Sequence, residues 1–140
     1  MPQPEYLMSL DVGDKRIGVA LAHRIARLPQ PLQTLQRTEN VMADISQLIK
    51  EHEVGALVVG LPRGMDGQYT DQTRATEAFA AQLKHELDIP VYLSDETLTS
   101  VQAETELGSR ARQDKGAIDA LAATYILEDF LHNHPEVLAV

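Results

Sequence analysis

The feature that most constrains this chain is an apolar run over residues 6–22, interrupted once by a short charged turn after residue 12. The β-favouring residues on both sides of the turn predict two strands that pair as a hairpin. We expect Gly13 to provide the positive φ that a short hairpin connection often needs. One carboxylate, Asp11, stands near the end of the first strand, where a charge is costly unless something pairs with it. A divalent metal on Asp11 and a nucleotide phosphate on the turn amides are the two candidate partners.

Length and composition exclude several classes of protein. At 140 residues, of which 44% are hydrophobic, we expect one domain covering residues 1–140. Neither an apolar run of membrane-spanning length nor a basic N-terminal region is present, so we expect no membrane helix and no secretory signal. The absence of cysteine excludes disulfides and thiolate metal sites and fits a cytoplasmic location. The net charge of -9 argues against a protein that coats nucleic acid without specificity.

After the hairpin, the period of the apolar residues changes repeatedly between that of a strand and that of a helix. The pattern predicts strands over 32–36, 56–61 and 91–93, and helices over 39–52, 70–88, 99–107 and 116–133. The stretch 23–31 is expected to be a loop, and 109–114 a polar, mobile segment. Three early strands followed by alternating helices and strands indicate an α/β fold, a mixed five-stranded sheet flanked by helices. This order of elements is that of the ribonuclease H-like fold.

Three acidic residues are expected at the sheet edge where such folds bind ligands, the carboxyl ends of the strands. Asp11 lies late on the first strand, Glu96 follows the last strand, and Asp119 lies in the first turns of the final helix. Crowded carboxylates repel one another, and Mg²⁺ or Mn²⁺ relieves that repulsion and can assist a phosphodiester displacement. The alternative interpretation is structural: Asp11 accepts turn amides, and Asp119 pairs with Lys115 one helical turn away.

Basic residues flank the same motifs, and we expect them to form a positive rim around the acidic pocket. Such a rim would let the local field, rather than the net charge, steer a polyanionic substrate. Scattered solubilising charge is the alternative interpretation. The candidate substrate-binding residues are Lys15, Arg16, Arg63, Arg110, Arg112 and Lys115.

Four motifs extend through almost the whole chain, at residues 11–20, 58–67, 95–99 and 115–123. In this order they resemble the YqgF family, also called RuvX-like. The resemblance implies a ribonuclease H-like fold and assigns the catalytic and metal-binding roles to Asp11, Glu96 and Asp119. The usual Asp-Glu-Arg of the family is Asp-Glu-Thr here, so an arginine is missing at Thr97, beside the expected site.

The resemblance implies a nuclease that matures the 5′ end of the 16S ribosomal RNA precursor, with Holliday junction resolution assigned to some members. The implied partners are structured RNA or branched DNA, with a homodimer as an open alternative. Two other functions compete with this one. Residues 11–18 also resemble the phosphate-binding hairpin of the actin, Hsp70 and sugar kinase ATPases. The second competing function is that of a non-catalytic ribosome-assembly factor, in which the acidic residues only stabilise the fold.

Overall fold

The computed structural model describes residues 5–96 and 115–138. Its strands form one five-stranded sheet in the order β3-β2-β1-β4-β5, with β1 antiparallel to β2 and parallel to β4. The α/β class and the mixed five-stranded sheet are therefore as the sequence predicts. The elements are β1 (Tyr6–Val12), β2 (Arg16–His23), β3 (Gln30–Gln36), α1 (Val41–Glu51), β4 (Val54–Pro62), η1 (Met65–Gly67), α2 (Asp71–Glu86), β5 (Val91–Glu96) and α4 (Lys115–Asn133).

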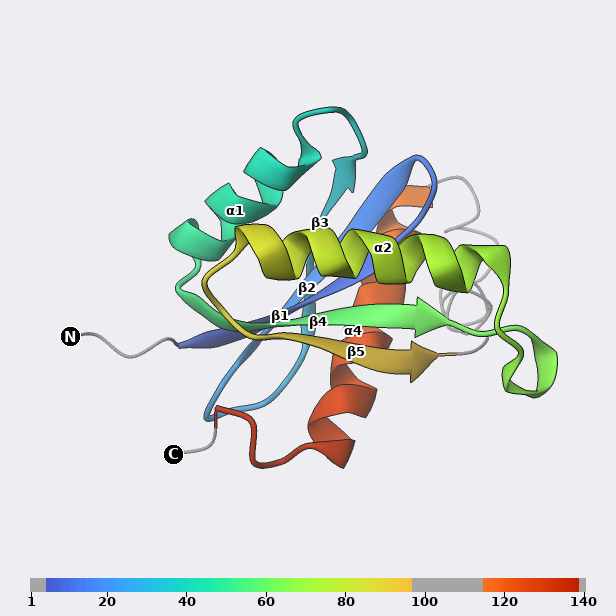
Figure 1. Cartoon of the computed structure of the whole chain (residues 1–140). Coiled ribbons are helices and arrows are strands. Elements are labelled where there is room, and N and C mark those ends of the chain that lie inside the picture. Colours follow the sequence, from blue (N-terminus) through green and yellow to red (C-terminus); the bar gives the residue numbers. More distant parts are fainter. Residues whose placement is uncertain (1–4, 97–114, 139–140) are drawn as a thin grey trace.

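The sheet is sandwiched between α1 and α2 on one face and α4 on the other (Figure 1). Alternate side chains of β1 enter the two layers: Leu10 packs with residues of α1 and α2, whereas Leu7 packs with residues of α4. Because both faces are covered, β4 is buried along nearly its whole length and is apolar throughout. None of the helices in the described part of the chain is long and apolar enough to cross a bilayer.

Both edge strands are longer than the sequence pattern predicts. β3 begins at Gln30 and includes Pro31, which an edge strand tolerates because it needs fewer ladder hydrogen bonds. β5 continues to Glu96, which pairs in parallel register with the last residue of β4. The last three residues of β5 are polar, so the sequence pattern did not predict them as strand. An edge strand can pair with its neighbour without alternating apolar residues. The expected helix at 99–107 and segment at 109–114 lie outside the described residues.

The turn between β1 and β2 requires glycine for a different reason from the one expected. Gly13 does not have a positive φ. Its amide instead donates to the Arg16 carbonyl at 2.9 Å, and a Cβ built on Gly13 would also lie 2.9 Å from that oxygen. Arg37 holds the turn from outside, donating through Nη1 to the Gly13 carbonyl at 2.9 Å. Close backbone approach, not a left-handed conformation, therefore excludes a side chain at position 13.

Candidate active site

Asp11 and Asp119 come together where the first turns of α4 cross the β1–β2 pair. In the ladder, Asp11 is paired with Gly18 on β2. The backbone of α4 lies directly on Gly18, because a Cβ built there would be only 1.9 Å from the Asp119 carbonyl oxygen. Glycine at position 18 thus allows the helix to approach the sheet closely enough to bring Asp119 beside Asp11.

The two carboxylates influence each other electrostatically. Burial in the first place, and the negative charge of Asp119 in the second, raise the pKa of Asp11 from its ordinary 3.8 to about 6. A buried carboxyl group beside a second carboxylate forms a site that suits a hard divalent cation. The oxygen-only chemistry of this pair therefore fits Mg²⁺ or Mn²⁺.

Arg16 compensates part of this negative charge. Its Nε donates to Oδ2 of Asp119 at 2.7 Å, across the sheet–helix interface. Asp119 thus forms an ion pair with β2. Arg16, expected on a substrate-binding rim, lies inside the acidic site. Lys115 is the first residue of α4, and its side chain lies outside the described residues.

Ser9 is a positioning residue that the sequence pattern did not single out. It is fully buried on β1, and its Oγ donates to the Ala123 carbonyl of α4 at 2.6 Å. Ala123 is one helical turn beyond Asp119, so this hydrogen bond fixes α4 close to the acidic pair. The available signal was a serine within the mostly apolar run of β1, two residues before Asp11.

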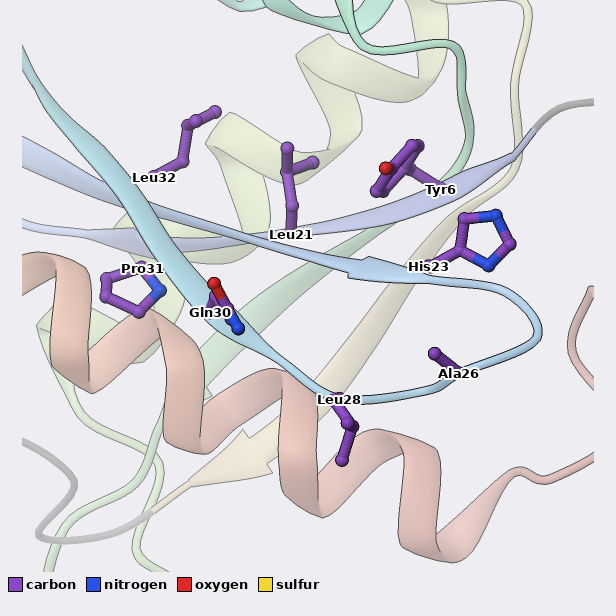
Figure 2. A pocket seen from close by; sticks show the side chains of 8 residues that line it. All are labelled: Tyr6, Leu21, His23, Ala26, Leu28, Gln30, Pro31 and Leu32. Carbon is purple, nitrogen blue, oxygen red and sulfur yellow. The ribbon is translucent and has the colours of Figure 1, made fainter.

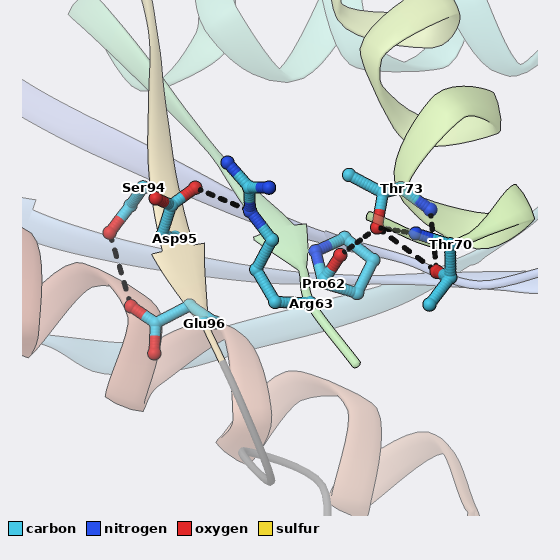
Figure 3. A network of polar contacts seen from close by, with 7 residues as sticks. All are labelled: Pro62, Arg63, Thr70, Thr73, Ser94, Asp95 and Glu96. Atoms are coloured by element: carbon cyan, nitrogen blue, oxygen red, sulfur yellow. Dashed lines mark hydrogen bonds and ion pairs between the residues drawn. The ribbon is translucent and has the colours of Figure 1, made fainter. Parts of the chain in front are cut away.

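Glu96 lies on the same face and at the same end of the sheet, but β4 separates its strand from Asp11. Tyr92 of β5 packs against Phe130 of α4, and the two-residue period puts Ser94 and Glu96 on that face too. Ser94 Oγ donates to Glu96 Oε1 at 3.1 Å (Figure 3). With strands about 4.8 Å apart, β1 and β5 are separated by about 10 Å.

The described residues accordingly contain no group of three or more His, Asp or Glu side chains close enough to hold one metal ion. The structure brings together Asp11 and Asp119, and it places Glu96 on the same face without joining it to them.

The remaining basic candidates are spread over the same sheet edge. Lys15 is exposed on the β1–β2 turn. Arg63 follows β4 and contacts Asp95, its Nε lying 3.3 Å from Oδ1, and Figure 3 shows Asp95 and Glu96 pointing to opposite sides of β5. Arg63 thus lies at the correct edge, but with Asp95 rather than with the acidic pair. Arg110 and Arg112 lie outside the described residues.

A separate hollow of about 380 Å³ opens at the opposite end of the sheet, near the start of β1 (Figure 2). It is lined by both apolar and polar side chains, and no carboxylate is among them. This hollow is therefore remote from the chemistry at Asp11. The lining residues are Tyr6, Leu21, His23, Ala26, Leu28, Gln30, Pro31 and Leu32.

The sheet order and the flanking helices define the ribonuclease H class of fold, and solved structures agree. The chain is similar to T. thermophilus RuvC in complex with a Holliday junction substrate, with a TM-score of 0.53, 12% identity, and 92% of this chain and 95% of that chain covered. It is also similar to the fowlpox virus Holliday junction resolvase, with a TM-score of 0.54, 10% identity and coverages of 91% and 98%. At these identities the likeness establishes the fold.

The particular family follows from the sequence. The profile of the RuvX family, described as "Holliday junction resolvase", matches residues 5–133, and the chain belongs to this family. A relative from Rippkaea orientalis is 44% identical over 130 residues, covering 89% of this chain and 93% of its own length. One from Moorella thermoacetica is 43% identical over 133 residues, with coverages of 89% and 93%. Both carry the name "Putative pre-16S rRNA nuclease". The family predicted from the four motifs is confirmed.

Proposed function

We propose that this protein is a metal-dependent nuclease that hydrolyses phosphodiester bonds in the precursor of 16S ribosomal RNA. The names of its relatives and its membership of the RuvX family support the substrate class. The observation that carries the proposal is the placement of Asp11 beside Asp119, over Gly18, at the carboxyl end of the central strand. A role in ribosomal RNA maturation agrees with the cytoplasmic location expected from the sequence.

Asp11 and Asp119 would hold the Mg²⁺ or Mn²⁺ ion, and Glu96 is the third candidate ligand because it lies on the same face and edge of the sheet. When bound, such an ion supplies positive charge that stabilises the attacking and leaving oxygens of the phosphodiester.

The chain's own residues provide the support for this chemistry. Ser9 and Gly18 fix the distance between α4 and β1, and Arg16 orients the Asp119 carboxylate. Lys15, exposed on the adjacent turn, is placed to attract the phosphate backbone of the substrate.

The test is a cleavage assay with a fragment of precursor 16S RNA and a four-way DNA junction, each with Mg²⁺, with Mn²⁺ and with excess EDTA. Asp11→Asn should reduce cleavage by about 100-fold or more, because a metal-assisted displacement loses several kcal/mol of transition-state stabilisation. Asp14→Asn, which removes an exposed carboxylate from the same turn, is the matched control and should cleave at close to the wild-type rate.

Full cleavage in EDTA would contradict the proposed metal dependence. Full cellular function of the Asp11→Asn protein would instead support a non-catalytic assembly factor, and measurable ATP binding would support the ATPase alternative.

Resolution of Holliday junctions is the second candidate function, favoured by the description of the RuvX family. A higher kcat/KM on the four-way junction than on RNA would establish it. Symmetric cutting of a junction needs two active sites, so this function also predicts a homodimer on the junction. Sedimentation of the protein–junction complex measures that stoichiometry.

A further inference from the structure

Tyr69 is an exposed aromatic residue at the same end of the sheet as the acidic pair. It stands between β4 and α2 and is 44% exposed, and it belongs to none of the apolar clusters of the described core. The guanidinium carbons of Arg63 and Arg74 each lie over its ring, 5.4 Å from the ring centre. An exposed tyrosine with arginines over its ring combines an aromatic surface with positive charge, and a stacking base would displace a guanidinium group from the ring.

The loop that carries Tyr69 is held firmly at both ends. The Arg63 amide donates to the Glu96 carbonyl at 3.0 Å, and the Gly64 amide donates to the Gln68 carbonyl at 2.8 Å. Thr70 and Thr73 form a capping box at the start of α2, and Thr73 Oγ1 also donates to the Pro62 carbonyl (Figure 3). Tyr69 immediately precedes this box, so its backbone is already ordered and binding costs little conformational entropy.

Each arginine contacts its acidic partner through one of its nitrogens. Asp95 Oδ1 lies 3.3 Å from Nε of Arg63 (Figure 3). Arg74 contacts Asp71 through Nη1 at 3.2 Å, and its side chain is 66% exposed. A phosphate beside Tyr69 could therefore accept charge-assisted hydrogen bonds from either guanidinium.

We propose that Tyr69, Arg63 and Arg74 form a binding site for one unpaired nucleotide of the substrate strand. The base stacks on the exposed tyrosine ring, and the adjacent phosphate is held by the guanidinium groups. This inference rests on the proposed nuclease function for its choice of nucleic acid as ligand. Because a stacked base must be unpaired, the site selects single-stranded or frayed segments over continuous duplex.

A tryptophan at position 69 provides a direct optical test, because the chain contains no other tryptophan. The Tyr69→Trp protein is titrated in EDTA, which prevents metal-dependent cleavage, with a short single-stranded RNA, the DNA of the same sequence, and the blunt duplex of that DNA. The indole fluorescence should be quenched by both single strands and remain unchanged with the duplex. Equal quenching by the duplex, or none by either single strand, would overturn the proposal.

Binding of fluorescently labelled single-stranded RNA to the unlabelled protein gives the second measurement. Tyr69→Ala should weaken the affinity about 5- to 100-fold, the range found for loss of one base–aromatic stack, whereas Tyr69→Phe should retain it. Arg74→Gln should weaken binding, and Lys84→Gln, an exposed charge at the other end of α2, is the matched control. Wild-type affinity in Tyr69→Ala would refute the stacking site.

These measurements separate the two proposals. If the protein cleaves no substrate with any metal ion, the nuclease function fails while the quenching of the Tyr69→Trp protein by single strands still stands. If Tyr69→Ala binds and cleaves RNA like the wild type, the nucleotide site fails while the nuclease function stands. When both hold, Tyr69→Ala should raise the KM for RNA more than it lowers kcat, because Tyr69 holds substrate away from the reacting atoms.

Discussion

The carboxyl group of Asp11 is unfavourable in the folded protein when no cation is bound. Its pKa is raised to about 6 by burial and by the neighbouring Asp119, so folding opposes its ionisation at neutral pH. Groups of this kind are typical of functional sites, since selection for stability alone would remove them. At the scale of one residue, the ionised carboxylate of Asp11 therefore lowers the stability of the metal-free fold at neutral pH.

Asp11→Asn is expected to stabilise the metal-free protein at neutral pH. Between about pH 4 and pH 6 the folded state retains a proton on Asp11 that the unfolded state has lost, so the stability of the wild type falls as the pH rises through this window. Relative to the wild type, the free energy of unfolding of the variant should be higher by on the order of 3 kcal/mol above pH 6 and little changed below pH 4. Urea unfolding in EDTA at several pH values measures this difference. A variant less stable than the wild type at pH 7 would show that Asp11 supports the fold.

Removing Arg16 should strengthen the binding of a divalent cation while weakening the metal-free fold. Its guanidinium is 2.7 Å from Asp119 and competes electrostatically with any cation at that carboxylate. Arg16→Gln should raise the affinity for Mn²⁺ on the order of tenfold, as expected for loss of one nearby positive charge at a partly exposed site. Calorimetric titration measures the Mn²⁺ affinity. The control is Arg24→Gln, which removes a charge just beyond the far end of β2. Unchanged Mn²⁺ affinity would mean that Arg16 does not compete for the site.

At the scale of the elements, the position of α4 decides whether the acidic pair exists. Among the described helices, α4 alone covers its face of the sheet, and it packs mainly through aliphatic and alanine side chains, including Ala123 and Ile126. Apolar packing sets the distance between α4 and the sheet, but Gly18 and Ser9 set how closely the first turns of α4 approach β1 and β2. A shift of α4 would separate Asp119 from Asp11 without unfolding the core.

Gly18→Ala should therefore destabilise the protein more than an ordinary overpacking substitution in the core. The new Cβ would meet backbone atoms of α4, with the Asp119 carbonyl oxygen at 1.9 Å. Gly60→Ala is the matched control, because its Cβ would meet the mobile end of the Ile126 side chain, Cδ1 at 2.4 Å. Gly18→Ala should lower the free energy of unfolding by more than about 3 kcal/mol and abolish cleavage. Gly60→Ala should lower it by about 1–2 kcal/mol and largely retain cleavage. Equal effects in urea unfolding and cleavage would contradict this interpretation of Gly18.

At the scale of the whole molecule, an acidic protein with a net charge of -9 is proposed to bind a polyanion. The local arrangement makes this feasible, because Lys15 and Arg63 lie on loops at the carboxyl edge and Arg74 lies in the first turn of α2. Four exposed acidic residues lie near the C-terminal ends of α1, α2 and α4, away from that edge: Glu51, Glu86, Glu128 and Asp129. The field at the site, not the total charge, then governs approach of the substrate.

The salt dependence of RNA binding should report these few contacts. Lys15→Ala should reduce the slope of log K against log salt by roughly 0.7 to 0.9, the value for one phosphate contact, while Lys84→Ala should leave it unchanged. Arg110→Ala with Arg112→Ala should reduce the slope further if these residues also bind phosphate. Slopes identical to the wild type in all variants would mean that the basic rim does not bind nucleic acid.

The sequence alone predicted the order of the five strands and of the helices α1, α2 and α4, the α/β class and the family. It also predicted that Asp11 is a carboxylate late on a buried strand. These conclusions depend on local periodicity and on short motifs, which the chain carries within each segment. The continuous apolar run of β4, for example, already indicated a strand covered on both faces.

Only the tertiary structure decided which groups meet. Asp119 contacts Arg16, 103 positions away in the sequence, a contact that no helical spacing indicates. Gly13 and Gly18 are required by close backbone contacts, which no local pattern distinguishes from a need for positive φ. Glu96 ends two strands from Asp11 because strand order, not sequence order, sets lateral distance in a sheet. Such contacts arise from the packing of both sheet faces at once, and that packing is a property of the folded chain alone.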